Sequence, residues 1–112
     1  MQNWVKEIDA PQLAQWLENK AEPCRVIDVR EMQEYTAGTL PGAELMPLAT
    51  LPLRATELGR DEKLVIICRS GARSAQACMF LQQQGYSNVF NLRGGMIGWA
   101  GKQFPVTLPK AV

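Results

Sequence analysis

The sequence predicts an α/β layer fold with a largely parallel sheet. Short apolar runs alternate along the chain with segments of helical periodicity, which is the pattern of strands joined by right-handed helical crossovers. The run at residues 64–67 is Leu-Val-Ile-Ile, without polar alternation, which is typical of a strand buried on both faces of a parallel sheet. We therefore expect this strand to be central, with helices on both faces of the sheet.

A cysteine and a short loop of small and basic residues follow the central strand. Cys68 stands where the strand ends, and after the loop a helix of about residues 72–84 runs until Gly85 stops it. In an open α/β sheet, ligands bind beyond the carboxyl ends of the strands, where the N-terminus of the next helix attracts anions. This position should lower the pKa of the thiol. The candidate site is the nucleophile Cys68 with the anion-binding residues Arg69, Ser70, Gly71, Ala72 and Arg73.

The alternative for Cys68 is ordinary packing, because a free cysteine usually behaves as a small buried hydrophobe. Arg69 and Arg73 favour the nucleophile, since arginines beside a buried strand end are unfavourable without an anion to meet. The sequence has no histidine, so fixed dipoles and arginines, and not an imidazole base, would have to activate the thiol. The other two cysteines are weaker candidates: Cys24 starts a strand, away from any helix N-terminus, and Cys78 fits core packing.

The cysteine count and the lack of nucleotide fingerprints argue against several kinds of site. The three cysteines are an odd number without Cys-x-x-Cys spacing, which argues against a disulfide framework, a redox dithiol and a zinc site. Neither the G-x-G-x-x-G pattern nor the G-x-x-x-x-G-K-[ST] pattern occurs. We expect catalysis by side chains and backbone alone, with no metal and no cofactor.

Before the central strand, the first predicted helix runs from the N-cap Asp9 to about residue 20. A stripe at helical spacing should face the core, and it consists of Leu13, Trp16 and Leu17. A buried strand at residues 25–29 follows and carries Asp28 near its carboxyl end. Asp28 and the nearby Arg30 could be catalytic, but a buried ion pair is the interpretation that we favour.

The remaining predicted elements are short and are delimited by glycine and proline. A helix that ends near residue 37 has Gly38 as its stop, and the Pro-Gly pair at 41–42 makes a turn. A last helix carries Trp99 inward. The other elements that we expect are a strand at 43–46, a helix at 52–58, a strand at 89–92 and the last helix at 96–102.

Length and composition indicate one globular domain over residues 1–112. The net charge of +1 argues against broad electrostatic binding to nucleic acid or to a membrane. No apolar stretch approaches the roughly 20 residues of a membrane span, and the first ten residues lack the order of a signal peptide. We therefore expect a cytoplasmic protein with reduced thiols.

Four motifs together resemble a known family, the single-domain rhodanese-like sulfurtransferases. They follow in the family's order and span most of the chain. They are VIDVRE at 26–31, GTLPGA at 38–43, CRSGARS at 68–74 and NLRGGMIGW at 91–99. The resemblance implies a rhodanese-like fold, with a mostly parallel five-stranded sheet flanked by helices on both faces.

The resemblance also implies a reaction. Cys68 would take a sulfane sulfur from a small anionic donor such as thiosulfate or glutathione persulfide, hold it as a persulfide, and pass it to cyanide or a thiol. The backbone amides of residues 69–73 would cradle the persulfide, and a sulfur-carrier protein could be a partner. Thr39 stands where the family's turn usually has a histidine. We expect this difference to alter local hydrogen bonding without loss of sulfur transfer.

Two other functions compete with this interpretation. Cysteine phosphatases and arsenate reductases of the related fold have five residues between cysteine and arginine, to give a tetrahedral oxyanion room. Here four residues separate Cys68 from Arg73, which favours a ligand of one sulfur atom. The second alternative is a non-catalytic rhodanese-like interaction module, but such domains commonly lose the cysteine. A sulfur-trafficking relay that is loaded by a partner remains compatible with the sequence.

Overall fold

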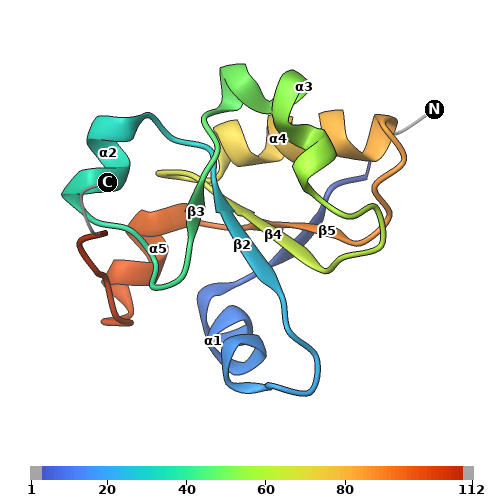
Figure 1. The fold of residues 1–112 in the computed structure, drawn as a ribbon. Coiled ribbons are helices and arrows are strands. Elements are labelled where there is room, and N and C mark those ends of the chain that lie inside the picture. The colour runs from blue at the N-terminus through green and yellow to red at the C-terminus, as the bar shows by residue number, and fades with distance from the viewer. Residues whose placement is uncertain (1–3, 110–112) are drawn as a thin grey trace.

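A five-stranded parallel sheet forms the centre of the computed structural model, which describes residues 4–109 (Figure 1). Every pair of neighbouring strands is parallel, and the strand order is β1-β5-β4-β2-β3. The strands are β1 (Lys6–Ile8), β2 (Arg25–Asp28), β3 (Glu44–Leu45), β4 (Leu64–Ile67) and β5 (Val89–Leu92). The predicted α/β class is confirmed, and the sheet is entirely and not only mostly parallel.

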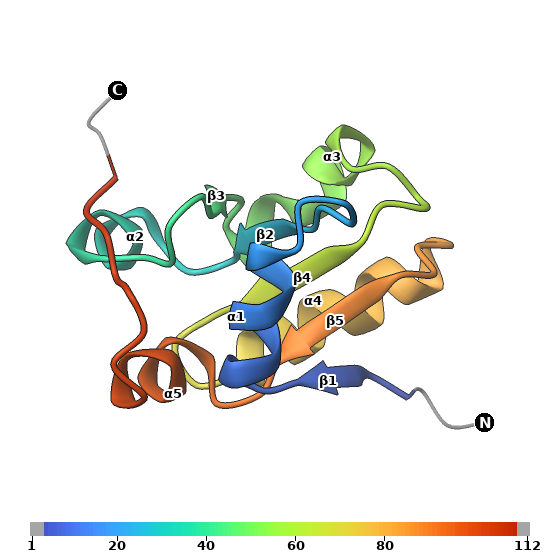
Figure 2. The same ribbon diagram turned by 90° about the horizontal axis from the view of Figure 1, so that it is seen from below.

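Helices cover both faces of this sheet, as predicted. They are α1 (Ala10–Glu18), α2 (Met32–Ala37), α3 (Leu51–Arg54), α4 (Ala72–Gln83) and α5 (Gly95–Gly101). Figure 1 shows α3 and α4 above the sheet and α1 and α5 below it, while α2 lies to one side, and Figure 2 shows the same arrangement from below. Two 3-10 turns flank α3, at Leu48–Thr50 and Ala55–Glu57.

The central strand β4 supplies side chains to two separate cores. Leu64 and Ile66 pack with residues of α3 and α4, whereas Val65 and Ile67 pack with residues of α1 and α5. All four side chains are fully buried. This explains why β4 is a continuous apolar run: successive residues of a strand point to opposite faces, and both faces are covered.

The first helix begins as its sequence predicts. The Asp9 carboxylate accepts a hydrogen bond from the backbone N–H of Gln12 at 2.9 Å, which caps the helix. Leu13 is fully buried, and Trp16 and Leu17 pack against the same core while remaining partly exposed. The Trp99 side chain is buried, as predicted, and donates its indole N–H to the carbonyl of Pro105.

Strand β1 is the element that the sequence did not locate. Only Ile8 of its three residues is buried, so the segment lacks an apolar run. The strand pairs along the edge with β5, where Glu7 stands opposite Asn91. Strand β3 has only two residues, shorter than the predicted 43–46. Within residues 4–109, no helix is long and apolar enough to cross a membrane.

Candidate functional site

Cys68 lies at the carboxyl end of β4, enclosed by the loop that leads into α4. Cys68 as a whole residue is 1% exposed to solvent. The backbone N–H of Gly71 donates to Cys68 Sγ at 3.1 Å, and the hydroxyl of Ser74, in the first turn of α4, lies 3.3 Å from the same sulfur. Gly71 has a φ of 107° as the residue before α4, a left-handed conformation that glycine adopts without strain. The loop therefore closes around the sulfur with hydrogen-bond donors.

These donors decide the ionisation of the thiol. Burial by itself acts to raise the pKa of Cys68. Hydrogen bonds from the Ser74 hydroxyl and from the backbone N–H groups of Ser74, Gly71 and Ser70 outweigh burial, so the pKa lies below that of an ordinary thiol. The direction agrees with the sequence-based expectation. The fixed dipoles of the loop contribute to the shift, as expected, whereas the arginine charges, which the sequence also suggested, are not among its causes.

Arg73 already has an anionic partner inside the chain. Its guanidinium makes a bidentate ion pair with Glu34 of α2, with N–O distances of 2.7 and 2.8 Å. The charge of Arg73 is therefore already met inside the chain, which removes one of the two arginine arguments for an anion. Arg69 is exposed and lines an open groove of about 560 Å³ together with Met96, Ile97 and Val106. Arg30 also lines this groove, but it is buried and paired with Asp28, so Arg69 is the exposed guanidinium of the two.

The first turn of helix α5 donates hydrogen bonds to the backbone of the cysteine loop. The backbone N–H of Met96 donates to the carbonyl of Cys68 at 2.9 Å, and that of Ile97 donates to the carbonyl of Arg69 at 3.0 Å. This approach depends on Gly95, since a Cβ there would lie 2.5 to 2.6 Å from backbone atoms of Cys68 and Arg69. Sequence reasoning did not find this contact between α5 and the cysteine loop.

Sequence reasoning also missed a chain of polar side chains behind the sulfur. The Ser74 hydroxyl lies 2.5 Å from Asn91 Oδ1, and the amide of Asn91 donates to Glu7 at 2.9 Å and to the carbonyl of Gly71 at 3.2 Å. Ser74 and Asn91 are buried. The available signal was a polar Asn91 inside an otherwise apolar strand, because a buried amide must find partners.

Asp28 and Arg30 form the buried ion pair that the sequence predicted. Arg30 binds both carboxylate oxygens of Asp28, at distances from 2.7 to 3.1 Å, and also donates to the carbonyl of Gly38. Thr39 donates its hydroxyl to the same carboxylate at 2.8 Å. The pair thus ties the end of β2 to the turn after α2, and Thr39 completes it.

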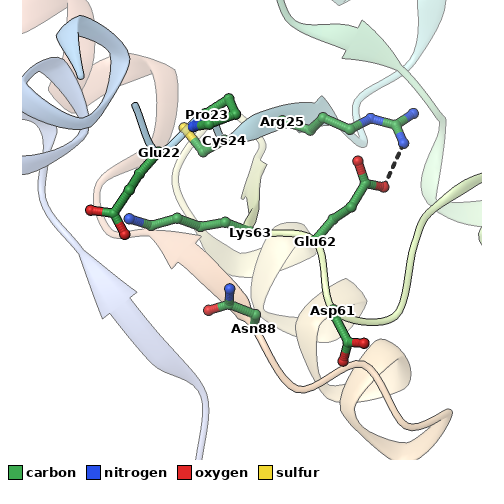
Figure 3. Close-up of a pocket in the computed structure, with 8 residues that line it drawn as sticks. All are labelled: Glu22, Pro23, Cys24, Arg25, Asp61, Glu62, Lys63 and Asn88. Carbon is green, nitrogen blue, oxygen red and sulfur yellow. Dashed lines mark hydrogen bonds and ion pairs between the residues drawn. The ribbon is translucent and has the colours of Figure 1, made fainter. Parts of the chain in front are cut away.

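The other two cysteines lack this environment. Cys78 is fully buried in the core, and burial raises its pKa to about 12. Cys24 is partly exposed beside a hollow of about 420 Å³ at the start of β2, where Figure 3 shows it next to Pro23, with Arg25 reaching Glu62. Burial outweighs the nearby Lys63 and raises the pKa of Cys24. Because the sheet is parallel, this hollow lies at the amino ends of the strands, whereas Cys68 lies at their carboxyl ends. Among residues 4–109, no three His, Cys, Asp or Glu side chains gather so as to hold a metal ion.

Comparison with known proteins gives one consistent result. The model of the rhodanese-like domain family matches residues 9–102. A sulfurtransferase of Allochromatium vinosum is 44% identical, over 95% of this chain and 98% of that protein. A putative sulfur carrier protein of Bacillus subtilis is 40% identical, over 72% of this chain and 44% of that protein. The crystal structure of a rhodanese-related protein of Thermoplasma volcanium superposes with a TM-score of 0.83, at 32% identity, over 94% of this chain and all of that one.

Proposed function

The chain belongs to the rhodanese-like domain family, and from this membership we propose that it is a sulfurtransferase that carries sulfur on Cys68. One observation carries the proposal: the thiol stands at the end of β4 inside a ring of donors, with Gly71 N–H at 3.1 Å and the Ser74 hydroxyl at 3.3 Å. Donors fixed in this way favour an anionic sulfur without any histidine.

The proposed reaction has two displacements at sulfur. The Cys68 thiolate attacks the outer sulfur of thiosulfate, a new S–S bond forms, and the old S–S bond breaks with its electron pair leaving on sulfite. The outer sulfur of the resulting persulfide is then attacked by cyanide or a thiolate. The S–S bond breaks, the electron pair returns to Cys68 Sγ, and thiocyanate or a new persulfide leaves.

We propose that the loop residues Arg69, Ser70, Gly71, Ala72 and Arg73 form the cradle for the outer sulfur. Successive backbone N–H groups at a strand-to-helix turn suit a small anion. The loop has four residues between Cys68 and Arg73, and Arg73 is occupied by Glu34. A phosphatase needs its loop arginine for the equatorial oxygens of the phosphoryl group, so this arrangement favours sulfur over phosphate.

Candidate donors are thiosulfate and glutathione persulfide, and candidate acceptors are cyanide, small thiols and a sulfur-carrier protein. Arg69 supports an anionic donor, because it is an exposed cation on the groove next to the cysteine loop. The similarity to a protein named as a sulfur carrier supports relay partners. A cytoplasmic location belongs to the proposal, since the three cysteines are free thiols.

Steady-state rates with three donors test the function. Thiosulfate, glutathione persulfide and a persulfidated carrier protein are each offered with cyanide as acceptor, and a small aryl phosphate is offered separately. We expect thiocyanate from at least one donor and no phosphate release. Cys24→Ser is the matched control and should retain the rate, because Cys24 lies at the amino ends of the strands, away from Cys68 at their carboxyl ends. Phosphate release without thiocyanate from any donor would overturn the proposal.

A further inference from the structure

Ser74 has one hydroxyl proton and two neighbours that can accept it. Its oxygen lies 3.3 Å from Cys68 Sγ and 2.5 Å from Asn91 Oδ1. A hydroxyl donates one hydrogen bond and accepts others, so Ser74 can serve only one of these acceptors at a time. The direction of this single proton therefore couples the strand residue Asn91 to the state of the sulfur.

The orientation of Asn91 is set by partners on its other side. Its amide nitrogen donates to Glu7 Oε2 at 2.9 Å and to the carbonyl oxygen of Gly71 at 3.2 Å. Both of these partners are acceptors, so the NH₂ group must face them and Oδ1 must face Ser74. Glu7 reaches Asn91 because β1 and β5 pair with these two residues in register.

The states of Cys68 differ in how well this arrangement suits them. With a thiol, the S–H donates to the Ser74 oxygen, the Ser74 hydroxyl donates to Asn91, and every polar atom has a partner. With a persulfide, the inner sulfur carries neither a proton nor the charge, and Ser74 again donates to Asn91. With a bare thiolate, the Ser74 proton stabilises the charge when it turns to the sulfur, and the Ser74 oxygen and Asn91 Oδ1 then face each other without a proton between them.

We propose that Asn91, held in place by Glu7, is a positioning residue that competes with Cys68 for the proton of Ser74 and so keeps the unloaded thiolate less stable than the loop alone would make it. The proposal rests on the proposed role of Cys68 as sulfur carrier. A less stabilised thiolate is the stronger nucleophile, because nucleophilicity falls as the pKa of a thiol falls. Asn91 thereby makes each Cys68 thiolate a stronger attacking group and lowers the fraction of Cys68 that is thiolate.

Other charged groups surround the sulfur and must be separated from this effect. Arg73 and Cys78 face it from α4, and Arg69 belongs to the loop itself. Glu34 of α2 neutralises Arg73, and the ion pair of Asp28 with Arg30 closes the end of β2. Cys78 is a neutral neighbour, and any effect of the arginines and carboxylates on Cys68 is one of charge. Asn91 is neutral and acts only through the Ser74 hydroxyl.

A double-mutant cycle on Ser74 and Asn91 tests the proposal, with the alkylation rate of Cys68 followed against pH and resolved by peptide mass. Asn91→Ala should lower the pH midpoint of Cys68 alkylation. At a pH below that midpoint, the thiolate fraction of Cys68 should rise about threefold to tenfold, as expected for one freed hydrogen bond. In a Ser74→Ala background, Asn91→Ala should have no effect. A shift of the same size in both backgrounds, or no shift in either, would overturn the proposal.

Asn91 is buried, so a second pair of variants at the edge residue Glu7 guards against loss of folding. Glu7→Ala releases the Asn91 amide and should lower the midpoint, while Glu7→Gln keeps an acceptor for the amide and should shift it less. Equal shifts would mean that Glu7 acts through charge alone and would overturn the proposal. Asn88→Ala is the matched control, because Asn88 directly precedes β5 at the amino end of the strand, away from Cys68. It should leave the pH profile of alkylation unchanged.

Alkylation measures the thiolate and not sulfur transfer, so the two proposals fail separately. If the cycle shows the predicted coupling in a protein that moves no sulfur, the positioning by Asn91 stands and the sulfurtransferase proposal fails. If sulfur is transferred and the cycle shows no coupling, the sulfurtransferase proposal stands and the role of Asn91 is refuted.

Discussion

Arg73 of α4 and Glu34 of α2 bind each other through two parallel contacts, at 2.7 and 2.8 Å. Glu34 also accepts from the backbone N–H of Glu31, which caps its own helix. The Arg73 guanidinium is the main reason why the pKa of Glu34 falls to about 2. The pair therefore joins the helix that follows the cysteine loop to the helix that borders the groove.

We predict that this pair makes stability depend on pH in the acid range. The folded pKa of Glu34 lies below its unfolded value of about 4.3, so the contribution is complete above that value and is lost as pH falls toward 2. Both side chains are about one third exposed, and after solvent screening we expect about 1 kcal/mol. Denaturant unfolding of the native chain and of Glu34→Gln, between pH 6 and pH 3, measures it. Parallel stability curves for the two proteins would contradict the assignment.

Gly95→Ala should destabilise the protein by about 2 kcal/mol or more and should also impair the site. Gly95 has a φ of 56°, and the added methyl group would overlap the carbonyl groups of Cys68 and Arg69. The backbone must move, which weakens the hydrogen bond from Met96 to Cys68. Thermal unfolding and the sulfur-transfer rate report the two effects. Gly101→Ala lies in the same helix, and apart from its chain neighbours and the helix's own backbone nothing lies within 4 Å of the new methyl. It is the control and should change stability by less than about 0.5 kcal/mol.

Removing the Thr39 hydroxyl should reduce stability while sparing chemistry. Thr39→Val removes the 2.8 Å hydrogen bond that the Thr39 hydroxyl donates to the buried carboxylate of Asp28. We expect the free energy of unfolding to fall by about 1 to 3 kcal/mol. Arg30 still neutralises Asp28, so the loop around Cys68 keeps its geometry. Unfolding and turnover are measured together. A collapse of turnover at unchanged stability would mean that Thr39 takes part in the reaction, and Thr36→Val, with an exposed hydroxyl, serves as control.

Neutralising Arg69 should raise the KM for thiosulfate by about twofold to fivefold, which is the range for one solvent-exposed charge. The effect should be small because the Arg69 side chain is exposed on the groove and is not desolvated. The effect should shrink as salt is added. Arg60→Ala, at the edge of the molecule near Gln84, should leave the KM unchanged. An unaltered KM in Arg69→Ala at low salt would show that Arg69 does not meet the donor.

The fold could be predicted largely because its strands are apolar runs buried on both faces. The strands at residues 64–67 and 89–92 were predicted with the bounds that the structure shows, because nearly all of their side chains are apolar and buried. Strand β1 could not be located, because it lies at the sheet edge with Lys6 and Glu7 exposed. Its place is fixed by hydrogen bonds to β5, which leave little trace in sequence.

The site could be predicted where it is local in the chain. Cys68 and its loop lie within six residues, so strand, turn and helix N-terminus can be inferred together. The partners that arrive from elsewhere could not be inferred. Glu34 comes from 39 residues before Arg73, and Glu7 comes from 84 residues before Asn91. The expectation that Arg73 lacked an anion failed because this long-range partner was invisible.

The central claim is that Cys68 carries the transferred sulfur. Intact-mass measurement after brief exposure to thiosulfate, glutathione persulfide or a persulfidated carrier tests it most directly, on the native chain, Cys68→Ser and Cys24→Ser. We predict that at least one donor adds the mass of one sulfur atom to the native chain and to Cys24→Ser, that cyanide removes it, and that Cys68→Ser stays unchanged while it remains folded. Sulfur retained by Cys68→Ser, or no added sulfur on the native chain with any donor, would contradict the account.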